Sequence, residues 1–232
     1  MGKRLIVQAR GRGGPRYKIP SHRYLGRIDY LPSGNFTAKV VDIVSDAIHL
    51  APIMVVKTED GKKILQIAPE GVQAGDFINY GSNEANVGNV IELSKVPVGT
   101  RVFGIETYTG SGPKLCRSSG SYALVAGVSG NNVTLQLTSG KEKILDGRCR
   151  ATIGVPAGGG RLEKPYYKVG QKWHAMTARG KLFPRTAGVA MTPTDHPYGG
   201  RKKSAKFKTI SRHAPPGRKI GSIAARRSGK PK

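Results

Sequence analysis

The sequence has few cysteines, few acidic residues and no long hydrophobic run. Its 232 residues include only two cysteines, Cys116 and Cys149, and neither belongs to a CxxC pair. Two cysteines are too few for a disulfide scaffold or for a zinc site with four cysteine ligands. Because the five histidines also lack ligand spacing, the sequence predicts reduced, buried cysteines and no metal site.

The longest apolar stretches are short, as at Ile53–Val56 and Ala123–Ala126. A membrane-spanning helix needs about 20 apolar residues. A secretory signal needs roughly 7–15, whereas only Leu5–Val7 are apolar near the start. Ile6 also stands where a myristoylation motif requires Ser or Thr. We therefore expect a soluble, intracellular protein.

Acidic residues are scarce at both ends of the chain. The whole chain has 39 Lys and Arg residues and 14 Asp and Glu residues, which gives a net charge of +25. Residues 1–23 hold seven basic and no acidic residues, residues 24–160 hold 13 and 12, and residues 161–232 hold 19 and two. A near-neutral centre between two basic ends predicts a globular body and a polyanionic partner.

Aromatic residues are interleaved with the basic residues near the carboxyl end. A charge run that only keeps a chain in solution would lack them. Basic side chains neutralise phosphates and aromatic rings stack on bases, so the pattern predicts a nucleic-acid partner, RNA rather than DNA. The six aromatic residues are Tyr166, Tyr167, Trp173, Phe183, Tyr198 and Phe207.

The central part has the period-two alternation of β-strands. Short alternating segments separated by glycine-rich turns predict an all-β fold of two small barrels. At Val41 the apolar phase shifts by one residue, which predicts a bulge or a strand buried on both faces. The one helix candidate, Gln171–Ala178, is short. The predicted strands are Tyr24–Leu31, Phe36–Val40, Met54–Thr58, Lys62–Ala68, Phe77–Tyr80, Val90–Leu93, Thr100–Tyr108, Tyr122–Val128, Val133–Thr138, Lys143–Leu145 and Arg150–Val155.

A Gly/Asn-rich connector at residues 81–89 predicts the boundary between the barrels. The predicted segments are a basic Arg/Gly-rich extension at 1–23, one barrel at 24–85, a second at 86–160, and a basic Gly/Pro-rich extension at 161–232. Segments with the composition of the two ends do not fold alone, so we expect them to order against a partner surface.

One cluster near the carboxyl end could carry chemistry. His196 could act as a general base that the adjacent Asp195 orients. Side chains of adjacent residues rarely adopt that geometry, however, and no nucleophile motif accompanies the two. The alternative is a rigid Pro/Gly loop whose polar side chains bond to RNA or to the loop's own backbone. The glycines at 11, 13 and 14 fit neither known phosphate-binding fingerprint.

The residues at 188–200, GVAMTPTDHPYGG, resemble the GVAMNPVDHP…GGG signature of the universal ribosomal protein L2 family of the large subunit. Further segments resemble that family in the same order, so the resemblance covers essentially the whole chain. The basic head and the residues at 211–221 are similar to its archaeal and eukaryotic branch. The further segments are IAPEGVQAGD at 67–76, VPVGT at 96–100, RSSGSY at 117–122 and CRATIG at 149–154.

The resemblance implies an oligonucleotide-binding (OB) barrel followed by an SH3-like barrel, with extended ends that thread into large-subunit rRNA. It implies a non-enzymatic structural constituent of the large subunit, working in the cytoplasm near the peptidyl-transferase region and in the joining of the subunits. The implied partners are large-subunit rRNA, neighbouring ribosomal proteins and the small subunit, with no membrane and no small-molecule substrate. It implies no cofactor beyond Mg²⁺ associated with the rRNA.

Three residues depart from the family pattern. Tyr198 stands where many bacterial members have a second histidine, and Arg201 follows two glycines where three are common. Thr192 replaces the usual asparagine, which predicts the loss of one hydrogen bond. His196 matches the family's signature histidine, and we interpret it as structural.

The predicted rRNA contacts combine exposed arginines of the body with residues of the two ends. We expect Arg117, Arg148 and Arg150 to present cations on the barrels. A generic binder would show little preference between rRNA and duplex DNA, and the non-repetitive motif at 188–200 disfavours that interpretation. The contact residues predicted in the ends are Arg10, Arg12, Arg16, Trp173, Arg179, Arg185, Met191, His196, Arg201, Lys202 and Arg218.

Overall fold

The computed structural model describes residues 2–201 and 209–226. Internal contacts divide the chain into two compact units. Ser21–Tyr166 form the first, called here the β unit. Met1–Pro20 and Tyr167–Lys232 together form the second, called the terminal unit. No helix in the described ranges is both long and apolar enough to cross a membrane.

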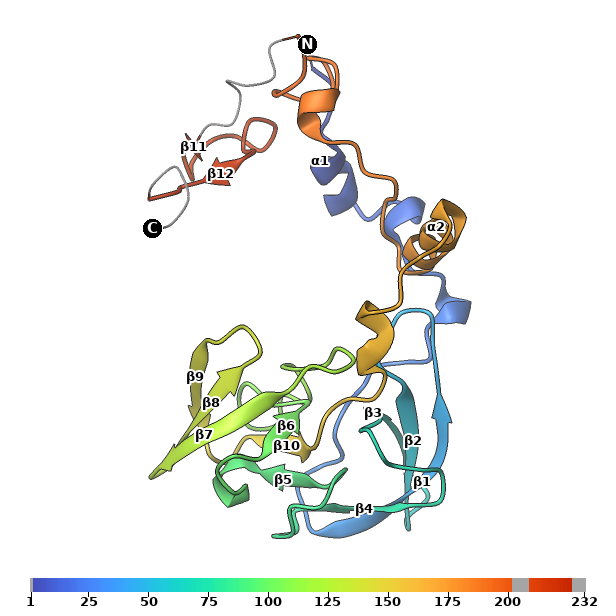
Figure 1. The fold of residues 1–232 in the computed structure, drawn as a ribbon, viewed down its shortest axis with the longest axis vertical. Helices are drawn as coiled ribbons and strands as arrows, with labels where there is room; N and C mark the ends of the chain where they lie inside the picture. Colours follow the sequence, from blue (N-terminus) through green and yellow to red (C-terminus); the bar gives the residue numbers. More distant parts are fainter. Residues whose placement is uncertain (1, 202–208, 227–232) are drawn as a thin grey trace. The chain divides into compact units, whose positions relative to one another are not determined.

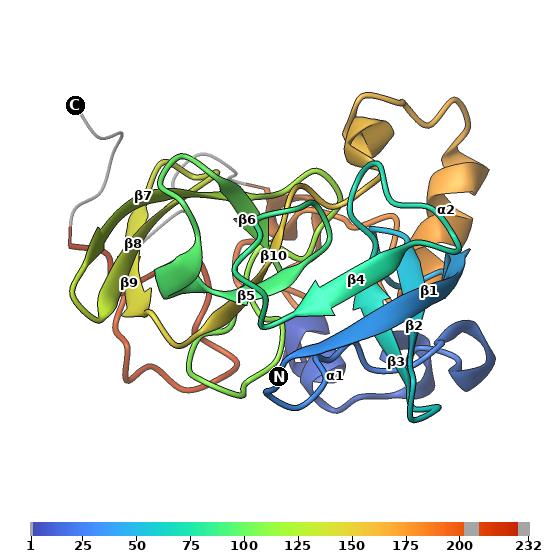
Figure 2. The ribbon, with the colours of Figure 1, turned by 90° about the horizontal axis from the view of Figure 1, so that it is seen from below.

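The β unit is built on a ten-stranded sheet with the order β3-β2-β1-β4-β5-β10-β6-β7-β8-β9 (Figures 1 and 2). Neighbouring strands pair antiparallel, except β4 and β5, which pair parallel through Tyr80 and Val90. The prediction of an all-β fold is therefore confirmed for this unit in the sense that its main secondary-structure elements are strands. The strands are β1 (Phe36–Val44), β2 (Ile53–Thr58), β3 (Lys63–Ile67), β4 (Phe77–Tyr80), β5 (Val90–Glu92), β6 (Arg101–Phe103), β7 (Ala123–Ser129), β8 (Asn132–Leu137), β9 (Glu142–Asp146) and β10 (Arg150–Ile153).

Strand β1 confirms the predicted bulge. The register between β1 and β2 shifts between Val40 and Asp42, so the intervening Val41 is the extra residue. Val40 is fully buried, whereas the side chain of Val41 is 46% exposed. An extra residue in one strand reverses the faces that later side chains occupy, which is why the apolar phase changes there.

Three apolar clusters form the interior of the β unit. One draws its members from residues 30–90 and another from residues 91–153. A third, smaller cluster joins the two halves, because it packs Ile53 and Ile67 against Phe103. The predicted division at residues 85 and 86 stays a prediction.

One predicted strand is absent and another is shorter than predicted. Tyr24–Leu31 is not part of the sheet, although its apolar residues Ile28, Tyr30 and Leu31 are buried. These side chains pack into the clusters from an extended segment whose Asp29 amide bonds to the Leu65 carbonyl at 3.1 Å. The predicted strand Thr100–Tyr108 is reduced to Arg101–Phe103, since the chain next turns toward a bridge between Ile105 and Leu115.

The terminal unit contains two short α-helices, α1 (Ile6–Gly11) and α2 (Val169–Ala178), and a small parallel sheet of β11 (Thr209–Ile210) and β12 (Ser222–Ile223). Helix α2 confirms the predicted helix and begins two residues earlier than expected. Helix α1 was not predicted. The Gln8 side chain accepts a hydrogen bond from the Leu5 amide at 3.0 Å, and the helix ends where the glycine-rich segment begins.

The two cysteines differ in burial. Cys149 is fully buried, as predicted, and Cys116 is half-buried. Both are free thiols, and burial raises the pKa of each. Within the described residues, no three His, Cys, Asp or Glu side chains gather as a metal site would require.

Candidate nucleic-acid interface

The segment from Gly188 to Gly200 folds into a compact loop held by its own backbone. A short 3-10 turn at Gly188–Ala190 opens it. The His196 amide then bonds to the Thr192 carbonyl at 3.2 Å, and the Gly200 amide bonds to the Met191 carbonyl at 3.2 Å. The segment is therefore a defined turn structure, which is what the Pro/Gly-loop interpretation predicts.

The His196 ring has a fixed position in this loop. It lies so close to Gly188 that a Cβ atom on that glycine would overlap the ring. Its Nδ1 atom accepts a hydrogen bond from the Tyr198 amide at 3.1 Å, and the two rings meet edge to face at 5.2 Å. Because Nδ1 is an acceptor, the neutral ring carries its proton on Nε2 and presents a donor there.

Asp195 does not orient His196. Its carboxylate accepts a hydrogen bond from the Thr192 hydroxyl at 2.9 Å and pairs with the Lys3 ammonium at 3.3 Å. The bond from Thr192 and the neighbouring Lys3 lower the pKa of Asp195. Thr192 also contacts the Thr194 hydroxyl at 3.0 Å, so this threonine keeps two polar partners.

The amino-terminal residues close one side of the loop. The Lys3 amide donates to the Thr194 carbonyl at 2.7 Å. Helix α1 then lies beside the loop (Figure 1), and together they enclose a hollow of about 60 Å³. Arg185, Met191 and His196, three of the predicted contact residues, all line this hollow.

Helix α2 carries two further predicted residues. The Trp173 side chain is 43% exposed and meets the His174 ring edge to face at 4.9 Å. Arg179 caps the carboxyl end of α2 and is half-buried. Sequence reasoning placed both in one contact set with His196, but neither lines the hollow at the loop.

Apart from the half-buried Arg179, the predicted arginines of the extensions are exposed, as phosphate contacts must be. None of them forms an ion pair with a carboxylate within residues 2–201 and 209–226. Arg117 and Arg148 of the β unit share both properties, whereas Lys202 lies outside the described residues. The exposed arginines of the terminal unit are Arg10, Arg12, Arg16, Arg185, Arg201 and Arg218.

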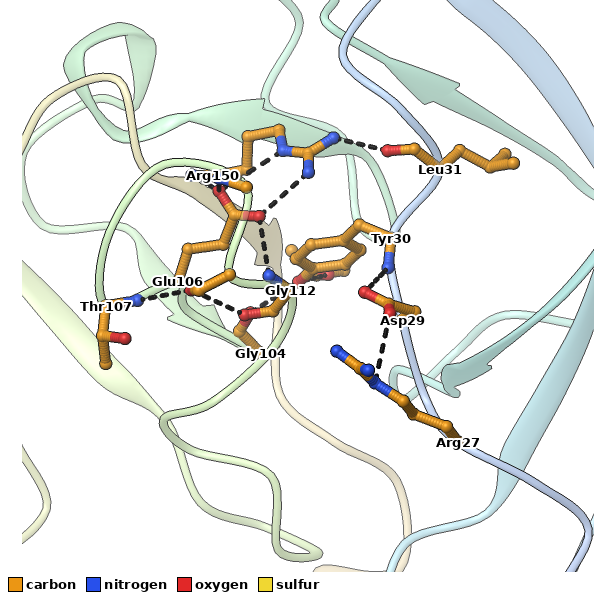
Figure 3. A network of polar contacts seen from close by, with 12 residues as sticks. Arg27, Asp29, Tyr30, Leu31, Gly104, Glu106, Thr107, Gly112 and Arg150 are labelled. Atoms are coloured by element: carbon orange, nitrogen blue, oxygen red, sulfur yellow. Dashed lines mark hydrogen bonds and ion pairs between the residues drawn. The ribbon is translucent and has the colours of Figure 1, made fainter.

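Arg150 is not the exposed cation that the sequence predicted. Its side chain is 12% exposed and pairs with Glu106, which is fully buried, at 2.9 Å (Figure 3). The guanidinium also donates to the Leu31 carbonyl at 2.6 Å and lies over the Tyr30 ring at 5.5 Å. The acid that neutralises it lies on a separate segment, 44 residues away in the sequence.

Arg150, held by Glu106, connects the two parts of the β unit that contribute the clusters at residues 30–90 and 91–153, because it bonds to the Leu31 carbonyl. Burial acts to raise the pKa of Glu106, but the hydrogen bonds and charge of Arg150 outweigh burial and the pKa lies below its usual value. The Tyr30 hydroxyl donates to the Gly104 carbonyl at 2.7 Å beside this pair, and burial raises its pKa. The first-half residues Tyr30 and Leu31 are thereby bonded to the second half.

Sequence reasoning missed Lys3 and the structural role of Gly188 and Gly199. Nothing near Lys3 in the sequence indicates its pairing with Asp195, because the two are far apart along the chain. Gly188 and Gly199 could be recognised in the sequence as members of the signature. Their role depends on the short distances from Gly188 to the His196 ring and from Gly199 to the Thr192 carbonyl, which only the folded loop shows.

Gly199→Ala tests whether RNA recognition needs this loop conformation. A Cβ at Gly199 would overlap the Thr192 carbonyl, so the loop must shift. Overpacking of this kind costs about 1–3 kcal/mol, and we expect rRNA affinity to fall about 5- to 150-fold. Filter binding at fixed salt measures it. Gly170→Ala, on α2 with no atom within 4 Å of the added methyl, is the matched control and should bind as wild type does.

Comparison with known proteins identifies what the chain is similar to. The family profile described as "Ribosomal Proteins L2, C-terminal domain" matches residues 86–219. The chain is 47% identical to "Large ribosomal subunit protein uL2" of Methanobrevibacter smithii, over 99% of each chain. It is also 47% identical to the protein of that name from Methanothermobacter thermautotrophicus over 99% of each chain, and 46% identical to that from Archaeoglobus fulgidus over the same shares.

Proposed function

This chain belongs to the ribosomal protein L2 family and is a structural constituent of the large ribosomal subunit, and we propose that it binds large-subunit rRNA mainly through its two basic ends. The β unit serves as a rigid platform for those ends. The proposal includes the finer fold prediction, that this unit is an OB barrel followed by an SH3-like barrel.

The distribution of charge carries this proposal. Of the 39 basic residues, 26 lie at 1–23 and 161–232, together with only two of the 14 acidic residues. The arginines described in these ends are mostly exposed and have no carboxylate partner there. A surface of unpaired cations releases counterions when it meets phosphates, which supplies binding free energy.

The ends and the platform have different roles in this mechanism. Ordering a chain on RNA costs conformational entropy, which neutralisation of phosphates offsets. Arginine suits such contacts because its planar fork binds phosphate through two hydrogen bonds and stacks on bases. Arg117 and Arg148 extend the contact onto the β unit, and Trp173 stacks on a base.

His196 recognises RNA and performs no chemistry in this proposal. Its Nδ1 atom already accepts from Tyr198, so Nε2 is left as a donor toward a phosphate or a base acceptor. Asp195, the neighbouring acid, is engaged by Thr192 and Lys3. Arg185 and Met191, which line the same hollow, supply a cation and an apolar surface.

The chain also has further partners and a location in the ribosome under this proposal. We infer that neighbouring ribosomal proteins and, across the interface, the small subunit are further partners in the cytoplasm. We place the loop at 188–200 near the peptidyl-transferase region. These inferences rest on membership of the family.

Replacing Arg185 and His196 by alanine tests the loop as an RNA contact. We expect the double variant to enter large subunits at less than a tenth of the wild-type level, because a charged and a neutral donor are both lost. Quantitative mass spectrometry of purified subunits gives this ratio. Gln136→Ala with Lys141→Ala, two exposed residues of the β unit outside the basic ends, forms the matched control. If the Arg185/His196 variant entered subunits as well as the control variant and the wild type, and supported normal translation, these two residues would not be RNA contacts.

A further inference from the structure

The outer face of the β unit carries an exposed aromatic ring beside two lysines. In the register of the sheet, Lys39 of β1 stands opposite Lys57 of β2 on one side and opposite Phe77 of β4 on the other. The three strands lie side by side in the order β2-β1-β4 (Figure 2). One cross-strand row therefore holds Lys57, Lys39 and Phe77.

Burial shows that this row faces away from the interior. The Phe77 side chain is 68% exposed, whereas its neighbour Ile78 is 1% exposed and belongs to the apolar cluster of the first half. Lys39 is likewise exposed between the buried residues Ala38 and Val40. The Phe77 ring therefore lies outside the core, beside the two lysines, where a partner can contact it.

The charges of the row are not neutralised by the described part of the chain. Neither Lys39 nor Lys57 forms an ion pair there, and like charges directly opposite on a sheet destabilise it. The Lys39 ammonium lies 5.9 Å from the centre of the Phe77 ring. The nearby carboxylates of Asp42 and Asp76 accept bonds from the amides of Ile43 and Gln73.

The row lies in a hollow large enough for a planar group. The hollow has a volume of about 300 Å³ and is lined by Lys39, Lys57 and Phe77 together with Glu59. Two lysines against one glutamate leave it with net positive charge. A second hollow of about 320 Å³ shares Thr37, Thr58 and Glu59 with the first and is also lined by Asp60 and Lys62.

We propose that the hollow lined by Lys39, Lys57 and Phe77 binds an unpaired RNA strand, with one base stacked on Phe77 and the adjoining phosphates held by Lys39 and Lys57. The inference rests on the proposed rRNA binding and adds a site outside the basic ends. A base presents a flat apolar face and its strand a regular series of negative charges, which match a ring beside two cations. A protein partner would need both an apolar group for the ring and acidic side chains for the two lysines, whereas every nucleotide of an RNA strand supplies a base and a phosphate.

Salt titrations of the intact chain on large-subunit rRNA test the proposal. We expect Phe77→Ala to weaken binding about 5- to 150-fold without changing the slope of log K against log salt, since stacking adds no counterion release. Phe77→Trp should restore or exceed wild-type affinity. Lys39→Gln with Lys57→Gln should reduce the slope by about 1.5, the value for two phosphate contacts. Ile144→Ala, a 66% exposed residue of β9, is the matched control.

Ultraviolet cross-linking of intact large subunits, read by mass spectrometry, locates the contact. We expect a nucleotide on the peptide that contains Phe77. Unchanged binding by Phe77→Ala, or a cross-link from this peptide to a ribosomal protein instead of RNA, would overturn the proposal while leaving rRNA binding by the ends intact. Failure of the wild-type chain itself to prefer rRNA would instead refute the proposed function.

Discussion

Arg150→Met is expected to reduce the free energy of unfolding of the β unit by about 3–5 kcal/mol, because it leaves a buried carboxylate without its cation. Glu106 is fully buried, and Arg150 supplies hydrogen bonds at 2.9 and 3.4 Å from its side chain and 3.0 Å from its amide. The variant also loses the 2.6 Å bond to the Leu31 carbonyl, and with it a connection between the two halves. Urea unfolding of the intact chain, followed by the circular dichroism of its strands, measures the loss.

Two further variants separate the buried charge from the loss of a large side chain. Arg148→Met removes an exposed arginine two residues away and should change stability by less than about 0.5 kcal/mol. Glu106→Gln combined with Arg150→Met removes both charges and keeps a side-chain oxygen for the Gly112 amide, so we expect it to be more stable than Arg150→Met alone. Equal effects of Arg148→Met and Arg150→Met would contradict the assignment of Arg150 to the interior.

The same pair sets a dependence of stability on pH. The pKa of Glu106 is lowered in the folded state, so its stabilising contribution is complete above the unfolded pKa of about 4.3 and is lost as pH falls through the folded value. In Arg150→Met the bonds and charge of the guanidinium are lost, whereas burial and the hydrogen bonds from the amides of residue 150 and Gly112 remain. The pKa of Glu106 therefore lies higher in the variant than in the wild-type chain, and lowering the pH costs the variant less stability. The stability difference between the two proteins should therefore shrink as pH falls from 7 toward 4.

Local pattern was sufficient to predict most strands of the β unit. Alternating burial makes a half-buried strand visible in its sequence, as in β8, where Val133 and Leu135 are buried and Thr134 and Gln136 are not. The bulge at Val41 was visible for the same reason, since an extra residue moves the apolar positions to the other parity. Tyr24–Leu31 has similar apolar residues but no strand neighbour, and pairing of that kind is not encoded locally.

Long-range partners could not be predicted from pattern. Arg150 was expected on the surface because an arginine in a basic protein resembles a phosphate ligand, and nothing near it in the sequence indicates Glu106. Lys3 and Asp195 meet only because both termini belong to one unit. Three residues of the predicted contact set do meet at the hollow, since Arg185, Met191 and His196 lie within one locally folded segment.

Removing both ends is expected to abolish most of the salt-dependent binding to RNA. Contacts with 6–10 phosphates make affinity fall about 10³- to 10⁵-fold between 50 and 200 mM salt. The intact chain should show a fall of this size on large-subunit rRNA. The β unit, Ser21–Tyr166, keeps only the four proposed phosphate contacts at Lys39, Lys57, Arg117 and Arg148. Its affinity should therefore fall only about 50- to 150-fold over the same range.

This comparison separates the two parts of the mechanism because the β unit has its own apolar clusters and ten-stranded sheet. Circular dichroism of the isolated unit must first match the β content of the intact chain. Removing only residues 1–20 provides an intermediate, because it deletes part of the charge and the Lys3 contacts that close the loop at 188–200. The salt slope should then fall by more than the deleted lysines and arginines alone would account for. The reason is that Arg185 and His196 are no longer held in place by the amino-terminal residues. Equal slopes for the intact chain and the β unit would mean that the platform, rather than the ends, is the principal RNA-binding surface.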